Sequence, residues 1–184
     1  MLYLLTRSCC ILFAFCAASL IIFFFLIPPS VSAAFTFDNT PSSINYDEEF
    51  SVSVTLSIGS SAGKNYYIRA AFSHPDSPSS YFGYIKNHEG TWYNKPTSNY
   101  SQYYRITMDE NNQWSGTVEV KADTEDSYYK GSGQYNFKLG RYTEGGSLSW
   151  SYNTSSITVL APPTSTQTPI TVPTNTPTPT AANT

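Results

Sequence analysis

Large apolar side chains alternate with serine and threonine in the segment from Phe50 to Ile58. This strict period of two predicts a β-strand with one buried face and one face in water, because successive side chains of a strand point to opposite sides. An α-helix would distribute the same apolar side chains around its axis. The segment that follows, Gly59–Gly63, is rich in glycine and serine and predicts a turn.

Similar patterns recur as far as Leu160, separated by turn-forming clusters such as His74–Pro78 and Asp109–Asn112. They predict further strands at Phe35–Ile44 (interrupted at Pro41), Asn65–Ser73, Tyr81–Lys86, Thr91–Tyr93, Tyr103–Met108, Gln113–Lys121, Gly133–Tyr142 and Ser149–Leu160. No segment of this region has the apolar spacing and caps of a helix. Many short strands at regular spacing are typical of a β-sandwich or barrel, so we predict an all-β domain over residues 35–160.

The segment Gly133–Phe137 favours one kind of sandwich. It resembles the tyrosine corner of immunoglobulin-like domains, in which a tyrosine bonds to the upstream backbone and a core residue follows two positions later. Tyr135 would form the corner, and Phe137 would be the core residue. The sequence therefore predicts an antiparallel immunoglobulin-like β-sandwich of roughly seven to nine strands, without the cysteine pair of antibody domains.

The N-terminal segment, residues 1–34, has the order of an export signal. A single arginine precedes an uncharged, almost wholly apolar run from Cys9 to Ile27, and small residues follow up to Ala33 and Ala34, where we expect cleavage. The run is nearly as long as the ~20 residues that span a bilayer, so an uncleaved signal anchor with an N-terminal hydrophobic helix is the alternative. Either form predicts a secreted or cell-surface domain that contacts the membrane only through this segment.

The last 24 residues, 161–184, include six prolines and nine threonines and carry no charge or aromatic ring. Such a segment cannot bury enough apolar surface to offset the entropy of ordering it. Thr/Pro-rich stretches often serve as spacers between modules. We therefore predict a disordered linker, and we expect the chain to be part of a longer multidomain protein.

Charge and cysteine content limit the chemistry of the domain. All 13 acidic residues but only nine of the ten basic residues lie within residues 35–160. An acidic surface argues against a nucleic-acid partner. The three cysteines, Cys9, Cys10 and Cys16, all lie in the apolar run. The mature domain is therefore expected to contain no disulfide, no cysteine nucleophile and no thiolate metal site.

We find no catalytic, cofactor-binding or metal-binding motif in the sequence. His74 and His88 are expected in solvated loops. The acidic run Asp123–Asp126 lacks the ligand spacing of a calcium loop, so we predict that it is a solvated loop as well. Carboxylate pairs for glycoside hydrolysis are defined by distance in space, so a sandwich enzyme stays as a third alternative. The favoured expectation is a protein that is not an enzyme and needs no cofactor.

Aromatic residues are the remaining candidates for a ligand surface. The chain has 15 tyrosines and three tryptophans. Exposed rings stack on sugars and dominate protein-binding hot spots, and we single out Trp92, Tyr93 and Trp150 as candidates. The opposing interpretation is that tyrosine fits the half-buried faces of sheets and has no ligand.

Several segments carry a resemblance to a known family. They are Phe35–Ile44, Ile68–Phe72, Tyr81–Tyr84, Gln113–Gly116, Gly131–Tyr135 and Leu139–Tyr142. Together they resemble a family of uncharacterised surface proteins from candidate-phyla bacteria with small genomes. In that family an exported immunoglobulin-like domain is followed by a Thr/Pro-rich linker and often by a lamin-tail-type β domain. The resemblance implies an immunoglobulin-like fold and surface display, and it implies no activity.

Two functional expectations follow from these observations. The first is a non-catalytic exported or cell-surface immunoglobulin-like module for adhesion or structural spacing, with a surface protein or a glycan as its partner. The second is a carbohydrate-binding module linked to a lost or separate catalytic domain. A ladder of exposed aromatic rings would favour sugar binding. A flat polar surface with buried aromatic rings would favour the spacer.

Overall fold

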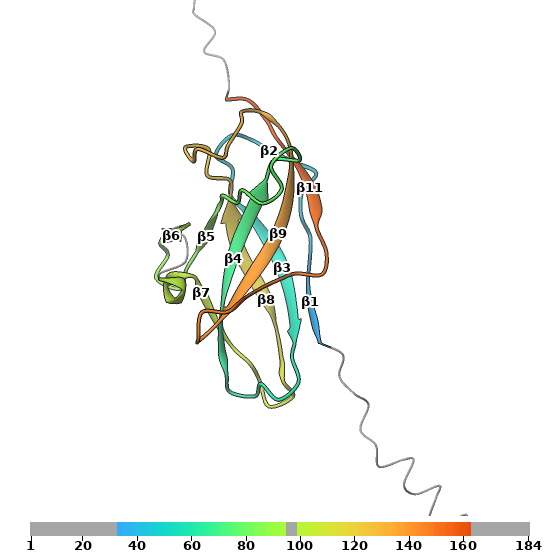
Figure 1. Ribbon diagram of the computed structural model, residues 1–184, viewed down its shortest axis with the longest axis vertical. Coiled ribbons are helices and arrows are strands. Elements are labelled where there is room, and N and C mark those ends of the chain that lie inside the picture. The colour runs from blue at the N-terminus through green and yellow to red at the C-terminus, as the bar shows by residue number, and fades with distance from the viewer. Residues whose placement is uncertain (1–32, 95–98, 163–184) are drawn as a thin grey trace, which may run out of the picture.

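The computed structural model describes residues 33–94 and 99–162 and contains an all-β domain built from two facing sheets (Figure 1). The strands are β1 (Ala34–Asp38), β2 (Ser43–Ile44), β3 (Phe50–Ser57), β4 (Asn65–Ser73), β5 (Tyr84–Lys86), β6 (Trp92–Tyr93), β7 (Tyr104–Thr107), β8 (Gln113–Lys121), β9 (Gly133–Thr143), β10 (Leu148–Trp150) and β11 (Ser155–Val159). A 3-10 turn, η1 (Tyr100–Gln102), precedes β7. Within these two ranges no helix is long and apolar enough to cross a membrane. The predicted N-terminal hydrophobic helix and nearly all of the predicted linker lie outside the described residues.

The strand order mixes both halves of the sequence in each sheet. The first sheet has the order β1-β3-β8-β5-β6, and the second has the order β2-β11-β9-β4-β7, with β10 added alongside β9. The strands pair antiparallel, except that β2 and β11 run parallel. The antiparallel, all-β part of the prediction is thus confirmed over the described residues.

The core lies between the two sheets and is made by the alternating apolar positions. Val52 and Leu56 of β3 are fully buried, as the period of two predicts. Phe37 of β1 and Phe50 of β3 both meet Phe137 of β9 edge to face, with ring centroids 5.3 and 5.7 Å apart. Such ring pairs contribute about 0.5–1.5 kcal/mol each beyond burial, which helps to join the sheets without a disulfide.

Two predicted strands are each divided, so the described residues hold eleven strands rather than the roughly seven to nine expected. The predicted strand Phe35–Ile44 becomes β1 in the first sheet and β2 in the second. Pro41 lies between them, and its missing N–H cannot take part in a sheet ladder. The predicted strand Ser149–Leu160 becomes β10 and β11, with a break around Asn153.

The break at Asn153 joins the two sheets at one edge. The side-chain amide of Asn153 accepts a hydrogen bond from the N–H of Phe37 at 3.2 Å and donates one to the carbonyl of Phe37 at 2.6 Å. Next to it, the N–H of Tyr152 donates to the carbonyl of Phe35 at 2.8 Å. Strand β1 is therefore bonded to β3 on one side and to the second sheet on the other.

The two ends of the domain lie at opposite ends of its long axis (Figure 1). Ala34 pairs with Ser57, beside the turn that joins β3 to β4. Val159 pairs with Gly133, where β9 begins, and β9 runs antiparallel to β4, so Val159 lies at the other end. A line between the ends of the domain therefore runs along the strands.

Candidate functional site

A cavity of about 350 Å³ lies beside Trp92 at the edge of the first sheet, and we call it the Trp92 pocket. Its walls come from the loop between β2 and β3, from strands β5 and β6, and from the end of β8 with the loop that follows. The lining residues are Tyr46, Asp47, Tyr84, Trp92, Lys121, Ala122, Asp123, Thr124 and Glu125. The pocket thus combines aromatic rings with charged and hydroxyl-bearing side chains.

Two lysines flank the indole of Trp92. Lys86 pairs with Trp92 between β5 and β6, and its Nζ lies 5.4 Å from the ring centroid. The Nζ of Lys121 lies 5.1 Å from the same centroid and 3.2 Å from the Asp47 carboxylate. Lys86 lies 2.7 Å from the Glu119 carboxylate, and this hydrogen bond raises the pKa of Lys86. Both ammonium groups therefore have a carboxylate partner and an aromatic ring.

Asp123 is only 5% exposed, so the expectation of a solvated loop is wrong for the first residue of the acidic run. Its carboxylate accepts hydrogen bonds from the side-chain amide of Asn94 and from the N–H of Glu125. Burial raises the pKa of Asp123. Burial, with the Asp123 charge next to it, also raises the pKa of Tyr84. Asp123 is thus a buried side chain whose hydrogen bonds to Asn94 and Glu125 stabilise the wall of the Trp92 pocket.

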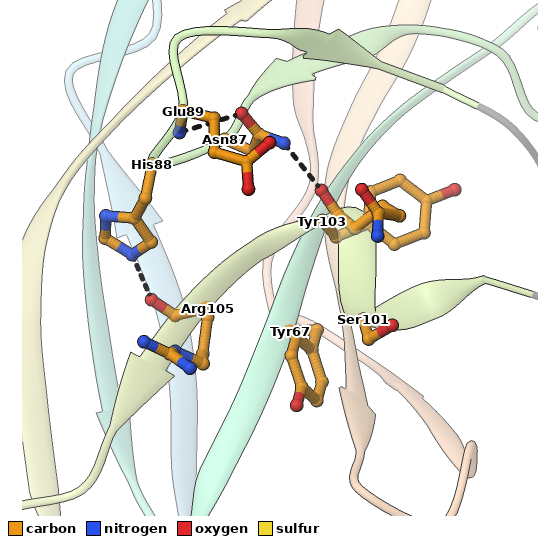
Figure 2. A pocket seen from close by; sticks show the side chains of 8 residues that line it. Tyr67, Asn87, His88, Glu89, Ser101, Tyr103 and Arg105 are labelled. Carbon is orange, nitrogen blue, oxygen red and sulfur yellow. Dashed lines mark hydrogen bonds between the residues drawn. The ribbon is translucent and has the colours of Figure 1, made fainter.

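A second cavity, of about 280 Å³, lies between the loop after β5 and strand β7 (Figure 2). The Nε2 of His88 donates to the carbonyl of Arg105 at 2.5 Å, and the imidazole stacks on Tyr104 with centroids 4.2 Å apart. The Nδ2 of Asn87 donates to the carbonyl of Gln102 at 3.2 Å. His88 is exposed, as expected, although the backbone of Arg105 and the ring of Tyr104 hold its imidazole in place. These side chains join the loop to β7 and η1.

Tyr93 and Trp150, the other two candidate ligand residues, pack against neighbouring side chains. The ring of Tyr93 meets Tyr103 edge to face at 4.8 Å. Trp150 lies over Gly140, where an added Cβ would come within 2.9 Å of the indole. The Nζ of Lys138 lies 4.2 Å from the Trp150 centroid. The structure therefore does not bring the three candidates together, since Trp92 belongs to the first sheet and Trp150 packs on the second.

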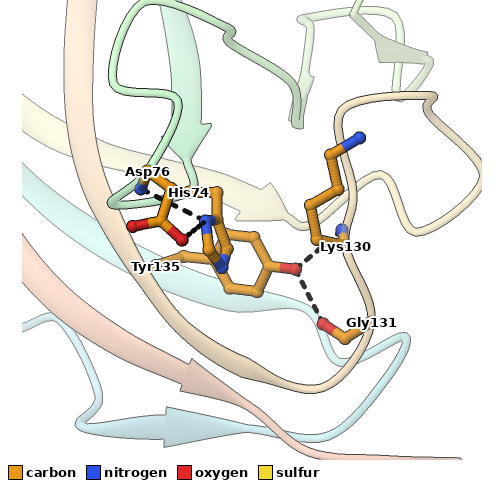
Figure 3. Close-up of polar contacts among 5 residues, drawn as sticks. All are labelled: His74, Asp76, Lys130, Gly131 and Tyr135. Carbon is orange, nitrogen blue, oxygen red and sulfur yellow. Dashed lines mark hydrogen bonds and ion pairs between the residues drawn. The ribbon is translucent and has the colours of Figure 1, made fainter.

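Tyr135, the expected tyrosine corner, is fully buried near the start of β9 (Figure 3). Its hydroxyl accepts a hydrogen bond from the N–H of Lys130 at 2.9 Å and donates one to the carbonyl of Gly131 at 2.7 Å. The imidazole of His74 packs against the Tyr135 ring at 5.6 Å, with Asp76 on its other side. Burial raises the pKa of Tyr135. These bonds join β9 to the loop that precedes it.

The expected cleavage residues stand where the described domain begins. Ala33 is exposed, and Ala34 is the first residue of β1. The rest of the predicted signal lies outside the described residues. Within residues 33–94 and 99–162, no group of three His, Cys, Asp or Glu side chains could hold a metal ion.

Sequence reasoning found Trp92 but missed the residues around it. Tyr46, Tyr84 and Lys121 are far apart in the chain and meet because β5 pairs with β8 beside the loop that leads into β3. The acidic run after β8 is the one sequence signal near this pocket, but its spacing fits no calcium loop and does not identify a site. The pocket depends on strand pairing, which a single sequence does not reveal.

Comparisons with known proteins add little to this site. No protein-family model matches the chain, and no curated protein matches it. A β-glucosidase from Listeria innocua shares 12% identity over 71% of this chain, with a TM-score of 0.40, and this chain spans 16% of its length. An alkylpurine DNA glycosylase, AlkC, from Pseudomonas fluorescens shares 15% identity over 74% of this chain and 33% of its own, with a TM-score of 0.39. AvmM, which catalyses macrocyclization in alchivemycin A biosynthesis, shares 10% identity over 73% of this chain and 92% of its own, with a TM-score of 0.40. Likenesses of this size carry no argument about function.

Proposed function

We propose that residues 35–160 form an immunoglobulin-like β-sandwich that is exported and serves as a non-catalytic structural spacer, transmitting tension between its two ends. The immunoglobulin-like assignment is supported by the two facing sheets and by the two hydrogen bonds of the Tyr135 hydroxyl to the upstream backbone. Its place outside the cytoplasm is supported by the arginine and the apolar N-terminal run that follows it.

The observation that carries the spacer proposal is the direction in which the first and last strands are loaded. Tension on Ala34 draws β1 along its partner β3, and tension beyond Val159 draws β11 along β9 in the opposite direction. The hydrogen bonds of an antiparallel pair lie across the strands. Sliding the strands past each other therefore strains many bonds at once, whereas peeling breaks them one after another.

The parallel pair β2–β11 adds to this arrangement. The N–H of Thr158 donates to the carbonyl of Ser42 at 3.0 Å, and the N–H of Leu160 donates to the carbonyl of Ile44 at 2.9 Å. Since β2 follows β1 and β11 ends the domain, opposite pulls on the two ends load these bonds in shear. The double bond of Asn153 to the backbone of β1 connects the same two sheets at the same edge.

The surface of the domain also favours a spacer over a ladder of sugar-stacking rings. The outer face of β3 and β8 is lined with polar side chains, in the cross-strand pairs Ser51–Glu119, Ser53–Thr117 and Thr55–Ser115. Among the described residues, the large apolar side chains classed as exposed are Tyr128, Leu148, Tyr152 and Leu160. They are scattered rather than aligned on one sheet face, as expected for a soluble surface without a broad apolar patch.

Two experiments test the proposal. An amine-reactive label that cannot cross membranes is expected to modify the lysines of the full chain on intact cells, and labelling only after lysis would contradict export. Pulling single molecules by the two ends of the domain is expected to meet more resistance than pulling two points at the same end. Equal resistance in both directions would contradict the load-bearing role.

A further inference from the structure

We propose that the Trp92 pocket binds a neutral saccharide. This inference goes beyond the spacer function and does not depend on it. The pocket has about 350 Å³, within the usual range for small-ligand sites. A half-buried indole stands at its edge, with the phenol of Tyr84 and that of Tyr46 as further walls. The ring carbons of these side chains offer an apolar surface against which the C–H face of a sugar ring can pack.

The charges around the pocket exclude most ionic ligands. Among the described residues, Asp47, Asp123 and Glu125 line it against Lys121 as the one basic lining residue, so the excess of carboxylates there repels an anion. A cationic ligand would seek the indole face, but Lys86 and Lys121 already lie 5.4 and 5.1 Å from its centroid. A neutral ligand is repelled neither by the carboxylates of the lining nor by the two lysines beside the indole.

The polar groups left at the surface match a ligand with many hydroxyls. Glu125 is exposed and forms no ion pair with any residue of the described ranges, so its carboxylate is able to accept hydrogen bonds. The ammonium of Lys121 uses one direction for Asp47 and has three donors in all. Thr124 adds a hydroxyl that both donates and accepts. Hydroxyl pairs of a sugar ring require this mixture of charged acceptors and donors beside an apolar face.

The pocket is also held in shape before any ligand arrives. Asp123 fixes Asn94 and the start of the loop at Glu125 by hydrogen bonds, and β5 is paired with β8 at Tyr84 and Lys121. A site with fixed walls loses less entropy on binding than one that must be ordered. By contrast, Trp150 packs against Gly140 and against Tyr81, with ring centroids 4.6 Å apart, and it lines neither of the two cavities described above.

The test uses the full chain, purified in a detergent without a sugar headgroup. A panel of neutral oligosaccharides and matched uronic or sulfated oligosaccharides is screened, and the best binder is titrated while tryptophan emission is followed. We expect saturable binding of a neutral oligosaccharide that weakens about tenfold or more in Trp92→Ala and severalfold in Glu125→Gln. Tyr152→Ala, which removes a ring 71% exposed and outside the pocket, is the matched control and should leave binding unchanged.

Three results would overturn the inference. They are no saturable binding of any neutral oligosaccharide at millimolar concentration, stronger binding of the acidic oligosaccharides, or equal weakening in Tyr152→Ala and Trp92→Ala. If Trp92→Ala does not fold, the exposed residue Glu125 decides, since Glu125→Gln keeps the shape of the side chain. The spacer proposal is judged separately, because strand β6 with Trp92 lies at the other edge of the first sheet from β1.

Discussion

The side-chain amide of Asn153 forms two hydrogen bonds with the backbone of Phe37, one to the N–H at 3.2 Å and one to the carbonyl at 2.6 Å. An amide side chain thereby takes the place of a neighbouring strand along the free edge of β1. This satisfies backbone groups that would otherwise form an exposed sheet edge. It also explains how one residue between β10 and β11 connects the two sheets.

Replacing Asn153 by alanine should therefore destabilise the whole domain. Two partly buried hydrogen bonds are lost, and each contributes about 0.5–1.5 kcal/mol, so the expected loss in the free energy of unfolding is about 1–3 kcal/mol. Urea unfolding followed by tryptophan emission measures it. Asn111→Ala is the control, because the exposed Asn111 side chain makes no hydrogen bond with the described residues. A loss no larger than that of the control would show that the amide is dispensable.

The Tyr135 hydroxyl gives a second prediction. Tyr135→Phe keeps the ring in the core but removes the bonds to Lys130 and Gly131. We expect a loss of roughly 1–2 kcal/mol in the free energy of unfolding, because two partly buried hydrogen bonds are removed and the N–H of Lys130 loses its acceptor. Tyr152→Phe removes a hydroxyl from an exposed ring and should change nothing measurable. If the two variants are equally stable in urea, the corner bonds contribute nothing.

Gly140 of β9 permits the side chains of the neighbouring strand β10 to pack closely on β9. A Cβ there would lie 2.9 Å from the Trp150 indole and 3.0 Å from both Arg69 Cγ and Leu148 Cδ1. Gly140→Ala should cost about 1–3 kcal/mol through overpacking and should shift the tryptophan emission, because the indole must move. Gly59→Ala is the matched control, since nothing lies within 4 Å of its added Cβ. A Gly140→Ala protein as stable as the control would mean that β10 moves without cost.

Tyr103 predicts a loss of stability at high pH. Burial raises the pKa of Tyr103 from 10.0 to about 12. Between these two values the unfolded chain releases the phenol proton while the folded domain keeps it, so the folded state loses stability as the pH rises through this window. A shift of this size corresponds to roughly 2–3 kcal/mol once the pH exceeds the folded-state pKa. Measured from pH 8 upward, the free energy of unfolding of the parent should fall relative to that of Tyr103→Phe, which has no phenol to titrate. Parallel curves would contradict the assignment.

The strands of the fold follow from the sequence wherever one face is buried and the other is wet. Strand β3 shows this, since Val52, Val54 and Leu56 are buried and the positions between them are serine and threonine. The interruption at Pro41 is predicted by the sequence, whereas the sheet that each strand beside Pro41 or Asn153 joins is not. Periodicity records the faces of a strand but not its partners.

The site could be predicted only in part for the same reason. Trp92 was found because its type suits a ligand surface, whereas Asp123 was dismissed as a solvated acid. Its burial comes from the covering by Asn94 and Tyr84, which are distant in sequence. Tyr93 illustrates the opposite error. Its residue type also suits a ligand surface, but its ring packs on Tyr103.

The most direct test of the central claim is single-molecule pulling in two directions. With handles joined on either side of residues 33–162, the strands β1 and β11 are loaded in shear. With one handle before Ala33 and the other at Gly59→Cys, β1 is peeled from β3 starting at the Ala34–Ser57 pair. The account predicts a rupture force higher by about a factor of two in the first geometry, lowered by Asn153→Ala in that geometry. Equal forces in both directions, or a lower force between the ends, would contradict a domain built to carry tension.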